Sequence, residues 1–246
     1  MDPSIYRRMA AVEDMHWWFA SRRAICDQMI DRMGLPRAAT ILEPGCGTGG
    51  NFPMLARRGQ LYAMDTDPSA LRFAASRGLA QLEQGSLPAD IPFGDTTFDL
   101  VVMTDVLEHL DDENGSLRAL RARLRSGGRL LLTVPALSWL WSEHDVMHHH
   151  RRRYRANQLR EVVSGAGFKV EYLSYFNVIL FPAIATVRTL QRMRRPVAQA
   201  MEGRHDLSMP SRSVNTFLRR LFSSERHLLT FARFPVGVSL ILLAHA

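Results

Sequence analysis

The feature that most constrains this chain is a glycine-rich segment that directly follows a short apolar run, I-L-E-P-G-C-G-T-G-G at residues 41–50. A strand that ends in glycines and opens a helix lets the backbone approach a ligand, because no Cβ intervenes. Gly45, Gly47 and Gly50 also satisfy the dinucleotide spacing G-x-G-x-x-G. The segment therefore predicts a nucleotide-type ligand at a strand–helix turn, without choosing between ligands.

The segments around this turn alternate in the pattern of a parallel sheet. Short apolar runs separated by stretches of helical spacing are typical of strands joined by crossover helices. The expected strands are residues 40–42, 60–64, 79–84, 98–103, 129–134, 168–174 and 236–244. The expected helices are 51–58, 69–77, 114–125 and 157–164, with a mostly helical segment at 6–33. The pattern predicts a doubly wound α/β protein.

The 246 residues are expected to form a single domain. We divide it into an N-terminal helical cap (1–35), a Rossmann-like core (36–175 and 235–246) and a helical insertion (176–234) before the last strand. Within the insertion, residues 202–212 are polar and expected to be mobile. Two cysteines, the lack of an apolar leader and apolar runs shorter than the ~20 residues of a spanning helix favour a cytoplasmic protein.

Two acidic residues near this turn bear on the ligand, and one of them suits a positive charge. Glu43 lies two residues before the first glycine, where dinucleotide sites usually keep an apolar residue. A carboxylate at this place suits an ammonium and a sulfonium better than a diphosphate. Asp65 ends the second expected strand, where a carboxylate can accept hydrogen bonds from ribose hydroxyls. Glu43 thus argues against a dinucleotide oxidoreductase.

Four blocks in this region resemble the class I S-adenosylmethionine (SAM)-dependent methyltransferases, in particular their bacterial small-molecule group. They are E-P-G-C-G-T-G at 43–49, Y-A-M-D-T-D-P-S-A-L at 62–71, I-P-F-x-x-x-x-F-D-L-V at 91–101 and V-L-E-H-L at 106–110. The resemblance implies SAM as the cofactor. It also implies a seven-stranded sheet of order 3-2-1-4-5-7-6 with strand 7 antiparallel, here with N-terminal helices and a helical insertion before the last strand.

The resemblance also assigns contacts with the cofactor. The backbone of Gly45, Cys46 and Gly47 would approach the methionine and ribose parts of SAM. Asp65 would hold the ribose hydroxyls, and the carbonyl of Thr104 would accept a hydrogen bond from the methionine ammonium.

The adenine contacts follow from the same resemblance. Thr66 would lie beside the adenine, and Ser86 and Leu87 would border it. Ser86 stands where many relatives have an aspartate that accepts from the adenine amino group. Adenine recognition would then rest on the backbone or on a shifted residue.

The N-terminal block M-H-W-W-F-A-S-R-R at 15–23 extends the resemblance. Helices of this kind in related enzymes cover SAM and pair an arginine with its carboxylate. Trp18, Arg22 and Arg23 are the candidates for this role. The alternative is an amphipathic helix that packs its tryptophans on the sheet and leaves its arginines in solvent.

The block E-H-D-V-M-H-H-H-R-R-R-Y at 143–154 resembles the D-x-x-x-G-H-x-R-R-Y stretch of many of these enzymes, with His149 in place of the glycine. It lies within a His/Arg-rich loop (136–155) after the fifth strand, where loops face the ligand crevice. His144, Asp145 and His150 are the candidate catalytic residues. His150 has the chemistry of a general base that Asp145 could orient.

Two other roles for these residues stay open, an orienting contact with the substrate and a purely structural hydrogen bond. No metal site is expected from the three adjacent histidines 148–150 with Asp145, because consecutive residues on an extended chain point to opposite sides and seldom converge on one ion. His109 is assigned no chemistry, since it is expected to be a structural histidine at the start of a helix.

The charge is unevenly distributed along the chain. Residues 1–145 carry 15 arginines and 19 acidic residues, whereas residues 146–246 carry 16 basic and 5 acidic residues. A coding bias toward arginine would explain the shortage of lysine. Alternatively, the C-terminal third meets something anionic, and a peripheral contact with an anionic membrane on the inner surface is the form that we expect.

The sequence therefore predicts a SAM-dependent methyltransferase acting on oxygen or nitrogen of a small or lipid-linked acceptor. One alternative is a methyltransferase for tRNA or protein, although no RNA-binding module is recognisable and a nucleic-acid partner is not expected. Another is a non-catalytic SAM-binding partner subunit. The oligomeric state does not follow from the sequence.

Overall fold

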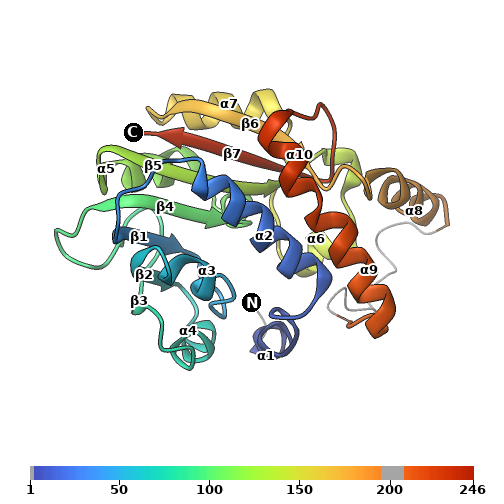
Figure 1. Ribbon diagram of the computed structural model, residues 1–246, viewed down its shortest axis with the longest axis horizontal. Helices are drawn as coiled ribbons and strands as arrows, with labels where there is room; N and C mark the ends of the chain where they lie inside the picture. Colours follow the sequence, from blue (N-terminus) through green and yellow to red (C-terminus); the bar gives the residue numbers. More distant parts are fainter. Residues whose placement is uncertain (1–2, 195–207) are drawn as a thin grey trace.

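The computed structural model describes residues 3–194 and 208–246, which build one mixed sheet flanked by helices (Figure 1). The sheet has the order β3-β2-β1-β4-β5-β7-β6, with β1 to β5 parallel and β7 antiparallel to both of its neighbours. This topology confirms the predicted one. The strands are β1 (Ala39–Pro44), β2 (Gly59–Asp65), β3 (Gln81–Gln84), β4 (Phe98–Thr104), β5 (Leu124–Pro135), β6 (Lys169–Phe176) and β7 (Ser239–His245).

The helices follow the strands in the alternation that the sequence predicts, with further helices at the N-terminus and before β7. The α-helices are α1 (Pro3–Val12), α2 (Trp17–Asp31), α3 (Phe52–Ala56), α4 (Pro68–Ala75), α5 (Glu113–Ala122), α6 (Glu143–Met147), α7 (Ala156–Gly165), α8 (Phe181–Arg194), α9 (Arg212–Ser223) and α10 (Glu225–Phe231). Two short 3-10 turns are η1 (Leu107–His109) and η2 (Ser138–Leu140). None of the described helices is long and apolar enough to cross a membrane.

Two cores form because successive side chains of a strand point to opposite faces of the sheet. Ile41 of β1 packs with α2, α3 and α10 on one face, whereas its neighbour Leu42 packs with α5 and α7 on the other. Both side chains are fully buried. The near-continuous apolar run of β4 has the same cause, since a central parallel strand is covered on both faces.

The insertion is anchored on the N-terminal helix, and Figure 1 shows α9 running beside α2. Asn215 of α9 accepts a hydrogen bond from the backbone N–H of Trp17 (2.8 Å) and donates one to the carbonyl of Met15 (2.9 Å). Trp18 stacks on Phe222 of α9, with 5.2 Å between the ring centroids. Segments about 200 residues apart in sequence therefore form one wall.

The structure corrects several expected boundaries. The fifth strand begins at Leu124 rather than at residue 129, because the chain enters the sheet immediately after α5. The segment 136–155, expected to be a loop, contains η2 and α6. The mobility expected for residues 202–212 falls partly outside the described residues.

Candidate active site

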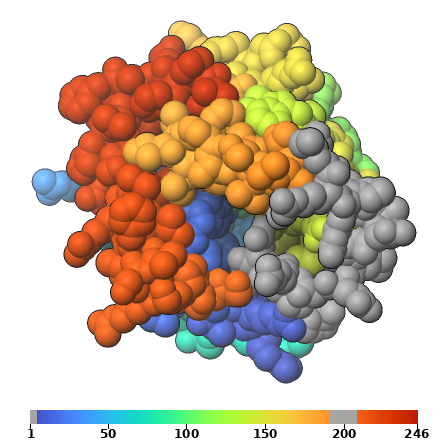
Figure 2. Space-filling model, turned by 90° about the vertical axis from the view of Figure 1, so that its right-hand side faces the viewer, coloured from blue at the N-terminus to red at the C-terminus, as the bar shows by residue number. Residues whose placement is uncertain are grey.

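A cavity of about 910 Å³ opens at the carboxyl ends of β1, β2, β4 and β5. The glycine segment lines one part of it, and the histidines of 144–150 line another. Side chains of α2 and α8 complete its walls. In Figure 2 the blue N-terminal helices are visible in a hollow between α8 and α9.

The glycine segment is shaped for close approach of a ligand. Gly45 has a φ of 69° and leaves no room for a side chain, since a Cβ there would lie 2.7 Å from a methyl group of Val106. Gly47 also has a left-handed φ, of 55°, which glycine adopts without strain. Its N–H donates to Asp65 Oδ2 over 2.8 Å.

Asp65 ends β2 and faces the cavity across this segment. Burial raises its pKa, while hydrogen bonds from the backbone of Asp67 and Gly47 lower it in part. Each carboxylate oxygen has two lone pairs, so both can still accept from ribose hydroxyls. The placement fits the role that the sequence predicts.

Glu43 is buried at the end of β1, and its carboxylate is well placed to bind a cation in the cavity. Its Oε1 accepts from Asn51 Nδ2 (2.7 Å), whereas its Oε2 has no hydrogen-bond partner among the described residues. Burial raises its pKa to about 8; Asn51 and the charge of Arg22 oppose this rise, and Glu13 and Asp65 add to it. A ligand ammonium beside Oε2 would satisfy the orphaned atom, so this end of the cavity fits SAM.

The two candidate arginines of α2 have different surroundings. Arg22 lies in the cavity wall and forms an ion pair with Asp105. Its buried Nε has no hydrogen-bond partner among the described residues. Arg23 donates to the carbonyls of Glu13 (2.8 Å) and Asp14 (3.1 Å), at the break between α1 and α2. Arg22 is therefore the better placed of the two for a ligand carboxylate.

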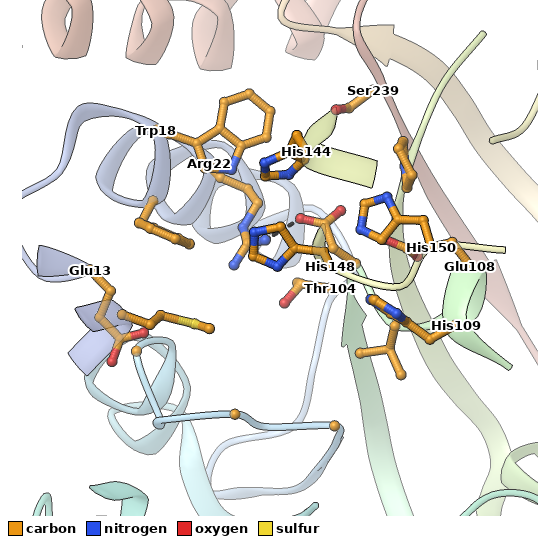
Figure 3. A pocket seen from close by; sticks show the side chains of 18 of the residues that line it. Glu13, Trp18, Arg22, Thr104, Glu108, His109, His144, His148, His150 and Ser239 are labelled. Carbon is orange, nitrogen blue, oxygen red and sulfur yellow. Dashed lines mark hydrogen bonds and ion pairs between the residues drawn. The ribbon is translucent and has the colours of Figure 1, made fainter. Parts of the chain in front are cut away.

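Three histidines meet in the part of the cavity that lies away from Glu13 (Figure 3). His144 and His148 lie one helical turn apart on and just after α6, with ring centroids separated by 4.3 Å. The His150 ring lies 5.8 Å from that of His144 and 6.0 Å from that of His148. The sequence expectation concerned the adjacent histidines 148–150 and assumed an extended chain. The turn of α6 and the left-handed φ of 55° at His149 instead bring His144, His148 and His150 together.

Asp145 orients the ring of His150 through a hydrogen bond with its Nδ1. Its Oδ1 accepts from His150 Nδ1 (2.8 Å) and Arg153 Nε (2.8 Å), and its Oδ2 accepts from the backbone N–H of Ser142 (2.8 Å). Burial would raise the pKa of Asp145, but these donors hold it well below its usual range. An ionised carboxylate only accepts, so Nδ1 of His150 carries the proton and Nε2 is left with a lone pair in the neutral ring.

Glu108 and His109 complete this end of the cavity, and the sequence interpretation gave neither of them a role. Glu108 is fully buried, which raises its pKa well above the ordinary value. His109 packs edge-on against His150, with 4.8 Å between ring centroids. Burial lowers the pKa of His109 to about 4, and the nearby His150 adds to this effect. Both residues lie in η1, shortly after the end of β4, so the rule that loops at the carboxyl ends of parallel strands face the ligand crevice, applied above to residues 136–155, could have found them.

The structure brings most of the predicted site residues to this one cavity. Ser86 does not line it; its backbone instead pairs with that of Asp90 in an isolated bridge. Asp145 acts from behind His150 and is fully buried. The other predicted residues line the cavity, namely Trp18, Arg22, Arg23, Glu43, Gly45, Cys46, Gly47, Asp65, Thr66, Leu87, Thr104, His144 and His150. Their contacts with SAM or an acceptor stay predictions.

The fold and this arrangement define a class I SAM-dependent methyltransferase. Residues 18–173 match the family model described as a methyltransferase domain, and the chain belongs to that family. A Mycobacterium tuberculosis protein described as a "probable S-adenosylmethionine-dependent methyltransferase" is 29% identical over 62% of this chain and 56% of its own length. The malonyl-[acyl-carrier protein] O-methyltransferase of Pseudescherichia vulneris is 27% identical over 58% of this chain and 60% of its own.

A solved structure shares the fold over almost the whole chain. It is a complex between the Haloferax volcanii Trm112 methyltransferase activator and a protein described as a "putative methyltransferase". The TM-score is 0.62 and the identity 18%, with coverage of 99% of this chain and 94% of that chain. The match with the curated relatives is shorter, since this chain spans little more than half of their length.

Proposed function

We propose that this protein transfers the methyl group of SAM to an oxygen or nitrogen of a small or lipid-linked acceptor. One observation carries the proposal: a single cavity joins the acidic and glycine-rich end, which fits SAM, to a histidine cluster and to apolar side chains of α8. Two ligands that must react need such a shared space. Aligning them accounts for much of the rate enhancement of a displacement reaction.

SAM supplies a methyl group activated by its sulfonium. The acceptor atom forms a bond to the methyl carbon while the carbon–sulfur bond breaks and leaves its electron pair on sulfur. The residues of this chain orient the two partners, exclude water and, for a hydroxyl acceptor, promote loss of the proton. The side chains of α2 and α8 enclose the cavity and suit the exclusion of water.

His150 and Asp145 promote the loss of the acceptor proton. In the form that the sequence predicts, Nε2 of His150 takes the proton itself while Asp145 orients the ring. In a second form, His150 holds an ion that makes the acceptor more acidic. The surroundings of Glu108 favour the second form.

The acceptor end of the cavity combines an apolar wall with polar groups. Leu180, Ile184 and Val187, near the start of the insertion, form the apolar wall. Arg188 of α8 also lines the cavity. Asn177 lines it as well, and neither atom of its fully buried amide has a hydrogen-bond partner among the described residues. This set favours an acceptor with a polar head and an apolar body. The O-methyltransferase among the relatives supports oxygen as the methylated atom.

The test uses the purified protein with SAM labelled in its methyl group. It is incubated separately with aqueous and lipid extracts, and the fraction that takes up label identifies the acceptor class. We expect label in the lipid fraction and a higher KM with Asn177→Gly, which removes the unpaired amide and adopts the left-handed φ of 55° at this position without strain. SAM binding by calorimetry with no transfer into any fraction would instead indicate a non-catalytic SAM-binding subunit.

A further inference from the structure

Glu108, His109 and His150 lie together at the acceptor end of the cavity, as Figure 3 shows. Each offers one ligand atom, and these three atoms lie within 4.8 Å of one another. Two imidazole nitrogens with one carboxylate oxygen form a donor set suited to divalent transition metals. The arrangement therefore has the chemistry of a metal site.

The carboxylate of Glu108 is not satisfied by hydrogen bonds in the described part of the chain. It is fully buried, and neither of its oxygens accepts a hydrogen bond there. Nε2 of His150 lies 3.9 Å from Oε1, which is too long for a hydrogen bond. An ionised carboxylate is unfavourable at a buried position without a partner, and a coordinated cation would stabilise it there.

The orientation of His150 suits ligation. Asp145 accepts from Nδ1, so the lone pair of the neutral ring is on Nε2, the nitrogen nearer Glu108. A carboxylate behind a ligating histidine is the common second contact in metal sites, because it fixes the tautomer and the ring. Arg153 and Ser142 in turn hold Asp145.

The backbone of the three residues is also fixed. Arg151 donates from its N–H to the carbonyl of Glu108 (3.0 Å) and from its Nε to the carbonyl of His109 (2.9 Å). These two hydrogen bonds connect the segment that carries His150 to η1, which carries Glu108 and His109. The candidate ligands from η1 and from the segment after α6 therefore have fixed positions relative to one another.

We propose that Glu108, His109 and His150 bind one divalent transition-metal ion, of the class of Zn²⁺, Mn²⁺ or Fe²⁺, at the acceptor end of the cavity. With bonds of ~2.0–2.2 Å, ligand atoms lie about 3–3.5 Å apart, so binding draws the three side chains together by about 1 Å. Three protein ligands leave positions open on the cavity side for an acceptor oxygen.

This inference rests on the proposed function and specifies its acceptor chemistry. An acceptor oxygen at an open position loses its proton to solvent more readily, because the nearby positive charge stabilises the oxyanion. The site would therefore select an acceptor with a hydroxyl or phenol group, and His150 would serve as a ligand rather than as the base.

The experiment measures metal binding directly and needs no acceptor. Protein treated with a chelator and dialysed is titrated with Zn²⁺ by calorimetry and with Co²⁺ by visible absorption, which reports the coordination geometry. We expect one ion per chain, and at least a tenfold weaker affinity in Glu108→Gln and His150→Ala. Asp145→Asn should weaken binding by about 10–100-fold, as loss of a contact behind a ligand usually does.

The controls separate this site from other histidines and from loss of folding. His227→Ala removes an exposed histidine of α10 and should leave the affinity unchanged. SAM affinity should stay within a factor of about two in Glu108→Gln, which shows that the variant is folded. No bound ion in protein that binds SAM would overturn the metal site and leave the methyltransferase proposal standing. Binding that survives Glu108→Gln and His150→Ala would also overturn it.

Discussion

Glu43 is the residue whose ionisation should report the arrival of SAM. Its pKa of about 8 in the cavity means that the carboxyl is mostly protonated at pH 7. A bound ammonium favours the ionised form, so binding should release a proton, and SAM affinity should rise with pH up to about pH 8 and then level off.

Calorimetry in two buffers with different ionisation enthalpies measures this proton. We expect release of close to one proton per SAM at pH 7, and almost none in Glu43→Gln. The same binding enthalpy in both buffers for the wild-type protein would contradict the assignment of Glu43 to the methionine ammonium.

Asp65 should contribute to SAM affinity through the ribose. Asp65→Ala removes hydrogen bonds to both hydroxyls and should cost about 2–3 kcal/mol, since charged hydrogen bonds contribute roughly 1.5–3 kcal/mol each and are not additive. Asp67→Asn is the control, because Asp67 lies two residues further on, caps α4 at Ser69 (2.8 Å) and is not among the residues that line the cavity. If both variants bind SAM equally well, Asp65 does not hold the ribose.

At the scale of elements, α6 shows where the sequence interpretation stopped short. The strands and crossover helices followed from apolar periodicity, and most of their boundaries differ from the structure by only a few residues. The helix α6 is a single turn with little apolar periodicity. Its start carries a capping box between Ser142 and Asp145, a pattern that is readable as S-x-x-D in the sequence.

The histidine cluster could not be predicted for a related reason. It depends on the left-handed backbone at His149, a position where non-glycine residues are uncommon. Glycine at this position of the resembling motif was the available sign of such a backbone, and its replacement by histidine concealed it. Contacts among Glu108, His109 and His150 require the relative placement of two segments about 40 residues apart.

His149→Gly should therefore stabilise the protein. A left-handed backbone costs a non-glycine residue roughly 1–2 kcal/mol, which glycine would relieve. Glycine also has more conformational freedom in the unfolded chain, and this offsets part of the stabilisation. We expect a net gain of about 0.5–1 kcal/mol in the free energy of unfolding by urea denaturation. His148→Gly is the matched control and should destabilise, because His148 has an ordinary φ of −85°. Equal losses in both variants would show that His149 carries no strain.

At the scale of the whole molecule, the SAM end and the insertion share one wall. The contacts of Asn215 and Phe222 with α2 tie α9 to the helix that carries Arg22, while α8 lines the acceptor end. A membrane surface that binds the insertion helices would therefore lie close to the acceptor end of the cavity. This arrangement favours an acceptor that is presented at a surface.

The outer side of the insertion has the composition of an interfacial surface. Phe217 of α9 is 62% exposed and Phe231 at the end of α10 is 93% exposed, which is unusual for aromatic side chains. Exposed arginines accompany them on these helices and on the following residues, including Arg212, Arg219, Arg220 and Arg233. Apolar side chains flanked by arginines suit insertion into an anionic lipid interface.

We therefore expect the protein to sediment with vesicles that contain acidic phospholipid, and to be released as the salt concentration rises. Replacing Arg219 and Arg220 by glutamine should weaken binding by about 2 kcal/mol, since each arginine near an anionic surface contributes about 1 kcal/mol. The matched control replaces Arg7 and Arg8 of α1, an exposed arginine pair on a different helix, and should bind as the wild type does. Phe217→Ser with Phe231→Ser should weaken binding at every salt concentration, because the apolar contribution is not screened. Absence of binding to strongly anionic vesicles at low salt would show that α8 and α9 only enclose the cavity, with the acceptor arriving from solution.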